Sequence, residues 1–359
     1  MSVISPLVEE MVKRNGSDLH LIAGDPPRMR LYGDLITMRD DELQAKDLEH
    51  VLGEIMPAAA EKLLAEKDQA DFAYAVEGLA RFRVNVFRHL GGIAAIMRAI
   101  PSTAKTLEEL RLPDVIGQLC RETQGLILVT GKTGSGKSTT LAAMIDELNR
   151  RNKGHILTIE DPIEFVHTRK GCLISQREIG VHSPTFSAAL HSAMREDPDV
   201  ILVGELRDLE TMSTALTAAE MGILVMGTLH TNGAAQTVDR MVNAFPAEKQ
   251  GHVRTMLSTS LRGVISQQLC RHKSGTGRVP AFEVMVNTPA VSNLLRQGKL
   301  DQLESAMQAG AKLGMLTMDN ALQVLVDTRF ISGREAYEKA ISKERFRVYA
   351  NQKDPGADS

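Results

Sequence analysis

Residues 131–138 read Gly-Lys-Thr-Gly-Ser-Gly-Lys-Ser, and the sequence on either side of them is typical of a strand and a helix. The run before them, Leu126-Ile-Leu-Val-Thr130, is apolar enough for a buried strand. The run after them, Thr139 to Leu148, favours a helix. Glycines in such a loop let backbone N–H groups curl around phosphate oxygens. A chance glycine-rich turn would explain neither flank, so we predict a phosphate-binding loop.

This loop supplies the candidate nucleotide ligands. Lys137 would neutralise charge on the β- and γ-phosphates, and Ser138 would ligate Mg²⁺, so we expect ATP with Mg²⁺ as the cofactor. The residues predicted to bind the nucleotide are Gly131, Thr133, Gly134, Ser135, Gly136, Lys137, Ser138 and Thr139.

Two acidic segments follow apolar runs farther along the chain. Val200-Ile-Leu-Val-Gly204 leads into Glu205, although the usual pattern has Asp at the strand end, where this chain has Gly204. A hydrolysing site needs a carboxylate there to hold Mg²⁺ or polarise the attacking water, so we assign that role to Glu205. In Thr158-Ile-Glu-Asp-Pro-Ile-Glu164, Pro162 should end the strand and turn the carboxylates outward. A solvated acidic turn explains this segment equally well on its own, but beside a phosphate loop a second catalytic role is favoured.

A third apolar run ends in Gly227-Thr-Leu-His-Thr231. It places His230 at a strand tip, where a side chain can sense a γ-phosphate. A lone histidine is more often a packed or surface residue, so this position needs support from its neighbours.

The order of apolar runs predicts an α/β protein. Residues 1–99 read as a small α+β domain that begins with an amphipathic helix, and residues 100–113, with a proline near each end, read as a linker. From 114 to 285, candidate strands at 126–130, 155–159, 200–203 and 223–229 alternate with helices, which predicts a parallel sheet covered by helices. Residues 286–350 have helical spacing, and residues 351–359 have a disordered composition.

Composition excludes several classes of protein. The chain has 359 residues with 42 Lys plus Arg and 45 Asp plus Glu, a formal charge of −3, so a nucleic-acid partner is not favoured. Its three cysteines have no CxxC spacing, which fits a reducing cytoplasm. Glu9 and Glu10 interrupt any signal-peptide core, and the apolar runs are far shorter than the roughly 18 residues of a membrane span. We expect no direct membrane insertion.

Together these motifs resemble the Walker A, Asp box, Walker B and His box of the secretion-superfamily ATPases. The matching segments are 131–138, 158–164, Arg195-Glu-Asp-Pro-Asp-Val-Ile-Leu-Val-Gly-Glu-Leu-Arg-Asp208 and 227–231. Ser17-Asp-Leu-His-Leu21 and Arg81-Phe-Arg-Val-Asn85, with the short overall length, are similar to the twitching-motility retraction ATPase (PilT) branch. The resemblance covers nearly the whole chain.

The resemblance implies a homohexameric ring of RecA-like ATPase domains, each preceded by a PAS-like domain and followed by a helical subdomain. Nucleotide would lie between the two kinds of domain, and ATP turnover would drive pilus disassembly. The ring would be cytoplasmic, peripheral to the inner membrane, and would act on a platform protein of the pilus machinery. By motif match, Arg83 and Arg98, with Arg88 as a further candidate, would reach the phosphates across an interface. Glu164 would activate water, Glu205 would be the Walker B glutamate, and His230 would belong to the His box.

Two departures keep alternatives open. The His box of many relatives begins Thr-Gly-His, whereas this chain has Met221-Gly-Ile223. The branch motif Ala-Ile-Arg-Asn-Leu-Ile-Arg-Glu reads Ala290-Val-Ser-Asn-Leu-Leu-Arg-Gln297 here, which leaves an accessory paralogue possible. A pilus-assembly or type II secretion ATPase would need a four-cysteine zinc insertion and a large extra N-terminal domain. A RecA-like DNA translocase should show a basic stripe or stacking aromatics, but the chain has no Trp and 4% aromatic residues.

Overall fold

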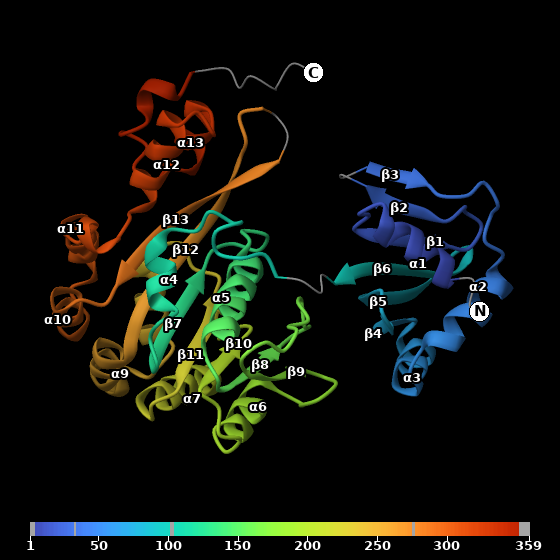
Figure 1. Cartoon of the computed structure of the whole chain (residues 1–359), viewed down its shortest axis with the longest axis horizontal. Coiled ribbons are helices and arrows are strands. Elements are labelled where there is room, and N and C mark those ends of the chain that lie inside the picture. Colours follow the sequence, from blue (N-terminus) through green and yellow to red (C-terminus); the bar gives the residue numbers. More distant parts are fainter. Residues whose placement is uncertain (1–3, 32–33, 101–103, 275–276, 352–359) are drawn as a thin grey trace. The chain divides into compact units, whose positions relative to one another are not determined.

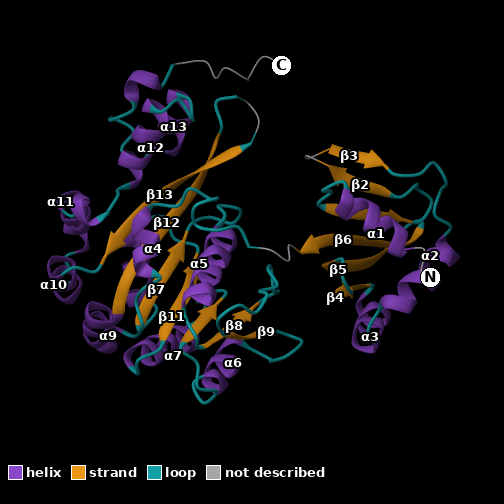
Figure 2. Cartoon of the chain, viewed as in Figure 1, coloured by secondary structure: helices purple, strands orange, loops and turns teal. Residues whose placement is uncertain are grey.

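The structure is a computed structural model, and it describes residues 4–31, 34–100, 104–274 and 277–351. The chain divides into two compact units, Met1–Thr103 with Glu164–Val166, and Ala104–Ile163 with His167–Ser359. Figure 2 shows the strands of each unit as one sheet flanked by helices. Residues 101–103 of the predicted linker and residues 352–359 of the tail predicted to be disordered lie outside the described residues.

The first unit is an antiparallel sheet with helices on one face. Its strand order is β3-β2-β1-β6-β5-β4, and every pairing is antiparallel. The strands are β1 (Asp18–Ile22), β2 (Arg28–Leu31), β3 (Asp34–Thr37), β4 (Gln69–Val76), β5 (Ala80–His89) and β6 (Gly92–Ile100). The helices are α1 (Ile4–Lys13), α2 (Ala45–Ile55) and α3 (Ala58–Lys67).

Side-chain periodicity determines how these elements pack. In α1 the buried residues Ile4, Leu7, Val8 and Met11 recur at the i, i+3, i+4, i+7 spacing of one helix face, which confirms the predicted amphipathic helix. In β5 the even-numbered residues from Phe82 to Val86 enter the same core, while Arg83 points to the opposite face. One face of this sheet therefore packs against the helices. The opposite face, which carries Arg83 and is here called the polar face, also holds apolar side chains such as Ile96.

The second unit contains a seven-stranded sheet in the order β13-β12-β7-β11-β10-β8-β9. Its strands are β7 (Gly125–Thr130), β8 (His155–Glu160), β9 (Leu173–Glu178), β10 (Val200–Val203), β11 (Leu224–Leu229), β12 (Leu261–Arg271) and β13 (Arg278–Val286). The predicted strands β7, β8, β10 and β11 are parallel, as expected, but the whole sheet is mixed, because β13 at one edge is antiparallel to β12. β12 and β13 are consecutive in the sequence and pair as a hairpin, so they need no crossover of the kind that joins parallel strands.

Helices cover both faces of this sheet. Leu126 and Leu128 of β7 pack with α6 (Phe186–Ala193), α7 (Leu209–Glu220), α8 (Ala234–Asn243), α9 (Ala247–Ser260), α10 (Pro289–Gln297) and α11 (Leu303–Ala309). Ile127 and Val129 pack instead with α4 (Asp114–Leu119) and α5 (Lys137–Arg151), which lie in front of the sheet in Figure 1. Burial on both faces explains why these strands read as continuous apolar runs.

The C-terminal helices form a separate small core. Leu322 of α12 (Met318–Asp327) and Ala336 of α13 (Gly333–Lys339) pack against Cys270 of β12 and Ala281 of β13. Figure 1 shows both helices beside the distal part of this hairpin. Short 3₁₀ turns are η1 (Leu300–Gln302), η2 (Ala311–Leu313) and η3 (Arg347–Tyr349). Within the described ranges, no helix has the length and apolar character needed to cross a bilayer.

Candidate functional site

Four neighbouring parallel strands bring the sequence motifs to one edge of the second sheet. The strands β7, β11, β10 and β8 lie side by side, and their carboxyl ends share that edge. The phosphate loop follows β7, His230 follows β11, Glu205 follows Gly204 at the end of β10, and the 158–164 segment leaves β8. In α/β sheets, ligands bind outside the carboxyl ends of the strands.

The phosphate loop has backbone angles that depend on glycine. Gly131 has φ 140°, Gly134 has φ 76° and Gly136 has φ 92°, all in the region that side chains disfavour. At Gly136 a Cβ atom would lie 2.7 Å from Nε2 of Gln267. Lys137, the first residue of α5, donates from Nζ to the carbonyl oxygens of Gly131 at 2.8 Å and Lys132 at 3.2 Å. Its ammonium group is thus held over the loop.

A buried hydroxyl in this loop has no hydrogen-bond partner. The Oγ atom of Ser135 is inaccessible to solvent and unpaired, although buried hydroxyls usually find partners. It lies two residues before the N-terminus of α5, where the helix dipole and free N–H groups favour an anion. A phosphate oxygen would satisfy both features.

Glu205 and His230 are in direct contact. His230 Nε2 lies 3.2 Å from Glu205 Oε1, and Arg207 donates from Nε to Glu205 Oε2 at 2.6 Å. The backbone holds the two strand tips together, because Leu206 N–H donates to Thr228 O at 3.0 Å and the Thr228 hydroxyl donates to Gly204 O. The carboxylate is four-fifths buried, with its side chain 20% exposed.

The 158–164 segment is held by one of its own side chains and by one from β9. Glu160 accepts from the Thr158 hydroxyl at 2.6 Å, and the buried Glu178 accepts from the Ile163 N–H at 3.2 Å. The Asp161–Pro162 peptide bond is cis. Glu164 falls in the range 164–166 that belongs to the first unit.

The N-terminal arginines lie on two different faces of the first sheet. Arg83 and Arg98 are cross-strand partners on the polar face, and Arg98 is in turn opposite Asp18. Arg98 Nε donates to Asp18 Oδ1 at 2.7 Å, whereas Arg83 Nε is 3.8 Å from an exposed carboxylate, that of Asp71. Arg88 lies on the helix-covered face and pairs with Glu49 of α2 at 3.3 Å.

Asp18 is a buried carboxylate on the polar face. Burial acts to raise the pKa of its carboxyl, but hydrogen bonds from Ser17 and Arg98, and the charge of Arg98, outweigh burial and lower the pKa. An ionised Asp18 therefore holds the Arg98 side chain, which is itself 68% exposed.

Comparison with known proteins identifies the family. The model of the family described as "Type II/IV secretion system protein" matches residues 1–283. The chain belongs to this family. It is 51% identical over 343 residues to the type IV pilus retraction ATPase PilT of Pseudomonas aeruginosa, covering 96% of this chain and 99% of that protein. It is 38% identical to the type IV pilus ATPase PilU of the same organism, covering 94% of this chain and 87% of PilU.

A solved structure agrees with this assignment. The crystal structure of the pilus retraction motor PilT with bound ADP superimposes with a TM-score of 0.90 at 42% sequence identity. The match covers 97% of this chain and 99% of that one. The resemblance to the PilT branch of the secretion ATPases is thereby confirmed.

The Ile223 departure from the family pattern lies away from the phosphate loop. Ile223 precedes β11, and its carbonyl accepts from the N–H of Gly125 at the start of β7. Ile223 and His230 flank the strand β11, so at the usual rise of about 3.3 Å per residue they lie about 23 Å apart. A histidine at 223 would therefore lie at the opposite edge of the sheet.

Gln267 is a site residue that we did not predict. It comes from β12, is 3% exposed, and accepts from the Thr140 hydroxyl of α5 at 2.7 Å. Its amide also closes the space beside Gly136. The sequence offered no signal, because 127 residues separate the two hydrogen-bonded side chains.

Replacing Gln267 with leucine should lower the free energy of unfolding by about 1–3 kcal/mol, because the buried Thr140 hydroxyl loses its acceptor. Urea unfolding of the second unit measures this change. Gln268→Leu, at the partly exposed neighbouring position, is the matched control. Equal stability of the two variants would contradict the role of Gln267 in fixing the loop.

The partly buried His167, which interacts with Asp146 of α5, makes the stability of the fold depend on pH. Burial lowers the pKa of His167 from 6.5 to about 4, and the charge of Asp146 opposes this less strongly. As pH falls, the unfolded chain therefore takes up the proton first, and stability is lost between pH 6.5 and about pH 4.

From pH 7 to pH 5 the wild-type chain should lose about 2 kcal/mol more stability than the variant His167→Asn. Urea unfolding at the two pH values measures the difference. His252→Asn, a change at an exposed histidine, should behave as the wild type does. The same pH dependence in all three proteins would contradict the assignment.

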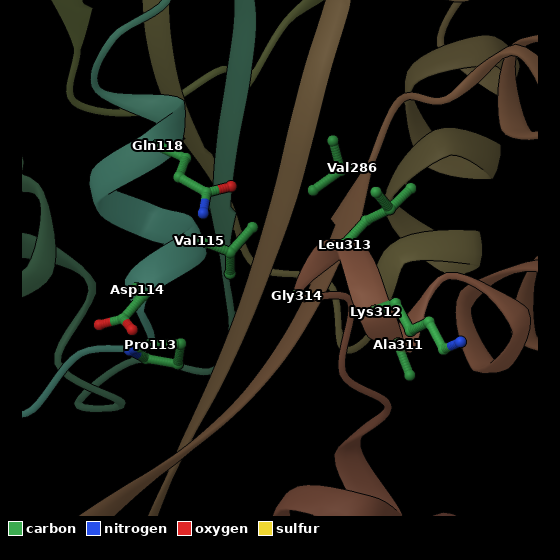
Figure 3. Close-up of a pocket in the computed structure, with 9 residues that line it drawn as sticks. All are labelled: Pro113, Asp114, Val115, Gln118, Val286, Ala311, Lys312, Leu313 and Gly314. Atoms are coloured by element: carbon green, nitrogen blue, oxygen red, sulfur yellow. The ribbon is translucent and has the colours of Figure 1, made fainter.

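One cavity in the second unit is separate from these motifs. Its volume is about 690 Å³, and its walls are α4, the turn η2 and the end of β13. Figure 3 shows Asp114 and Lys312 on opposite sides of it. No residue of the phosphate loop, nor Glu205 or His230, lines this cavity.

Proposed function

We propose that the chain is an ATP-driven motor that retracts type IV pili and so powers twitching motility. The observation that carries this proposal is the 51% identity to the PilT ATPase over nearly the full length of both chains. The Lys137 ammonium group and the unpaired Ser135 hydroxyl of the phosphate loop support ATP as the substrate. ATP hydrolysis supplies the free energy for removing subunits from a filament.

The site residues divide into binding and catalytic groups. Gly131, Thr133, Gly134, Ser135, Gly136, Lys137, Ser138 and Thr139 would bind the phosphates of ATP. Ser138 and Glu205 are the proposed Mg²⁺ ligands, a fitting set because Mg²⁺ usually takes one or two protein oxygens and completes its shell with phosphate and water. Mg²⁺ supplies charge neutralisation when bound. In the part of the chain that the structure describes, no cluster of three His, Cys, Asp or Glu side chains suits a different metal.

The chain's own acid and base groups would then prepare water. Glu205 accepts a hydrogen bond and is four-fifths buried, so it suits the role of orienting or polarising a water molecule. His230, whose Nε2 lies 3.2 Å from Glu205 Oε1, would sense whether a γ-phosphate is present. Glu164 is the proposed second carboxylate for this step.

Arginines of the first unit would complete the site. Arg83 and Arg98 share the polar face of the sheet, and we propose that they contact the phosphates when the two kinds of domain close over the nucleotide. Asp18 would hold Arg98 in an extended, exposed position until then. An arginine in this role stabilises charge that develops on the transferred phosphoryl group.

The proposed assembly follows the family. We propose a homohexamer of RecA-like domains (114–285), each with a PAS-like domain (1–99), a helical subdomain (286–350) and movement in the connecting stretch 100–113. An antiparallel sheet with helices on one face supports the PAS-like assignment. The ring would lie in the cytoplasm against the inner-membrane platform protein of the pilus machinery. The chain's −3 charge gives no support to a nucleic-acid partner.

Deletion of the gene in its source organism tests the function. Excess surface pili that fail to retract, restored by the wild-type chain but not by Lys137→Ala, would support a retraction motor. Bald cells would contradict it and favour an assembly ATPase. ATPase activity stimulated by DNA would instead revive the translocase alternative.

An accessory paralogue is the second candidate, favoured by the changes at Ser292 and Gln297. In the structure the Ser292 hydroxyl donates to Ser258 O of α9 at 2.7 Å, and Gln297 donates to Asn293 at 3.0 Å. Both side chains therefore form hydrogen bonds within this chain. The branch motif has a charged residue, Arg or Glu, at each of these two positions. Normal pilus retraction after deletion, with a defect only when another retraction ATPase is also absent, would favour this candidate.

A further inference from the structure

Glu283 is a buried carboxylate near the nucleotide edge of the sheet, and none of the motifs accounts for it. It lies on β13 opposite Ser266 of β12, which is in turn opposite Thr130, the last residue of β7 before the phosphate loop. Its side chain is among the buried polar groups, at 7% exposure. A carboxylate in such a place needs specific partners, because burial of an unpaired charge is costly.

Its two oxygens bind the N-termini of two helices. Oε1 accepts from the Ala234 N–H at 2.7 Å, and Oε2 accepts from the Met318 N–H at 3.2 Å. Ala234 is the first residue of α8 and Met318 is the first residue of α12. Helix N-termini favour a negative charge, so one carboxylate stabilises both helix starts.

Helix α8 begins directly after residues 230–233, which we call the His230 segment. Only Thr231, Asn232 and Gly233 separate His230 from Ala234, and the Gly233 N–H donates to the Ser266 hydroxyl at 2.8 Å. The Thr231 hydroxyl is 2.7 Å from that of Thr237 within α8. The segment that begins at His230, which is in contact with Glu205, is therefore hydrogen-bonded to β12 and β13 at its other end.

The α12 end of the contact is joined to the rest of the C-terminal helices. Asp319, the residue after Met318, accepts from the N–H groups of Ile341 and Ser342 at 2.8 and 2.9 Å. These two residues follow α13. A shift of α12 or of the segment after α13 would therefore alter the hydrogen bond between the Met318 N–H and Glu283.

We propose that Glu283 is a positioning residue that couples the placement of α12 and α13 to the His230 segment, residues 230–233. The C-terminal helices thereby set the turnover of bound ATP without contacting it. This proposal rests on the proposed function, since it assumes that the site hydrolyses ATP.

A pair of substitutions at Met318 isolates the α12 contact. Proline is well tolerated at the first position of a helix, and the preceding Thr317 has the extended backbone that proline requires, so Met318→Pro removes the N–H without breaking α12. Met318→Ala loses the same buried side chain but keeps the N–H. We expect Met318→Pro to have a kcat at least about fivefold lower than Met318→Ala, with KM for ATP and Kd for ADP unchanged.

A pair of buried glutamates provides the second comparison. Glu335 is 3% exposed and also accepts a backbone N–H, that of Arg271, but it belongs to the C-terminal core. Glu283→Gln should lower kcat at least about fivefold with little change in KM, because an amide has one acceptor oxygen for the two N–H groups that Glu283 binds. In Glu335→Gln the amide oxygen can still accept from the Arg271 N–H, so α13 stays in place and kcat should stay within about twofold of the wild type. A fall in kcat that follows the fall in Tm in both variants would indicate a merely structural role and overturn the proposal.

Amide hydrogen exchange gives a readout that does not need turnover. Residues 230–236 should exchange faster in Met318→Pro than in Met318→Ala. Equal exchange rates together with equal kcat values would overturn the proposal. Absence of ATP turnover in the wild-type chain, with the exchange difference present, would contradict the proposed function and leave the mechanical coupling standing.

Discussion

Lys137→Ala is expected to lower ATP turnover by about 100-fold or more, the largest loss of any single change that we propose at the phosphate loop. Lys137 is a buried residue, 9% exposed, and its ammonium group is held by two carbonyl oxygens of the loop, those of Gly131 and Lys132. No other ammonium group is fixed in this way among the hydrogen bonds described for the loop. Its removal leaves the β- and γ-phosphates without a cation from the loop.

The matched control is Lys132→Ala, which removes an exposed lysine from the same loop. Its turnover should stay within about twofold of the wild type, because an exposed charge is screened by solvent and salt. Steady-state phosphate release measures turnover, and titration with a fluorescent ADP analogue measures nucleotide binding in the two variants. Comparable turnover in Lys137→Ala and the wild type would contradict the nucleotide-site assignment.

The central strands of the second unit were readable from sequence because burial on both faces makes them apolar throughout. The candidate strands 126–130, 155–159, 200–203 and 223–229 match β7, β8, β10 and β11 to within one residue at each end. Edge strands carry less of this signal. β9 reads Leu-Ile-Ser-Gln-Arg-Glu and is mostly half-buried, so hydrophobicity does not distinguish it from a loop.

Apolar runs in the sequence predicted only those site residues that come directly after a strand. The phosphate loop, Glu205 and His230 each come straight after an apolar run, and the parallel order of the strands brings them to one edge. Gln267 and Glu283 could not be found in this way. Their partners lie 127 residues away for Gln267, and 49 and 35 residues away for Glu283, so only the fold reveals the contacts.

Glu205→Gln is expected to lower kcat by about 100-fold while nucleotide binding stays close to that of the wild type. The amide keeps the shape of the side chain, but it is a weaker acceptor than the carboxylate that Arg207 and His230 now contact. Glu196→Gln is the matched control. Glu196 is also paired with an arginine, Arg177 at 2.8 Å, but it precedes β10 and so lies at the other end of the strand.

A Mg²⁺ titration of the Glu205→Gln variant separates the two roles open to this carboxylate. If Glu205 holds the metal, the variant should bind Mg²⁺ more weakly and recover turnover as the Mg²⁺ concentration rises. If Glu205 polarises water, turnover should stay low at saturating Mg²⁺, because the missing group acts on the nucleophile. Its contact with His230, which would sense the γ-phosphate, favours the second outcome. Wild-type turnover in Glu205→Gln at every Mg²⁺ concentration would exclude both roles.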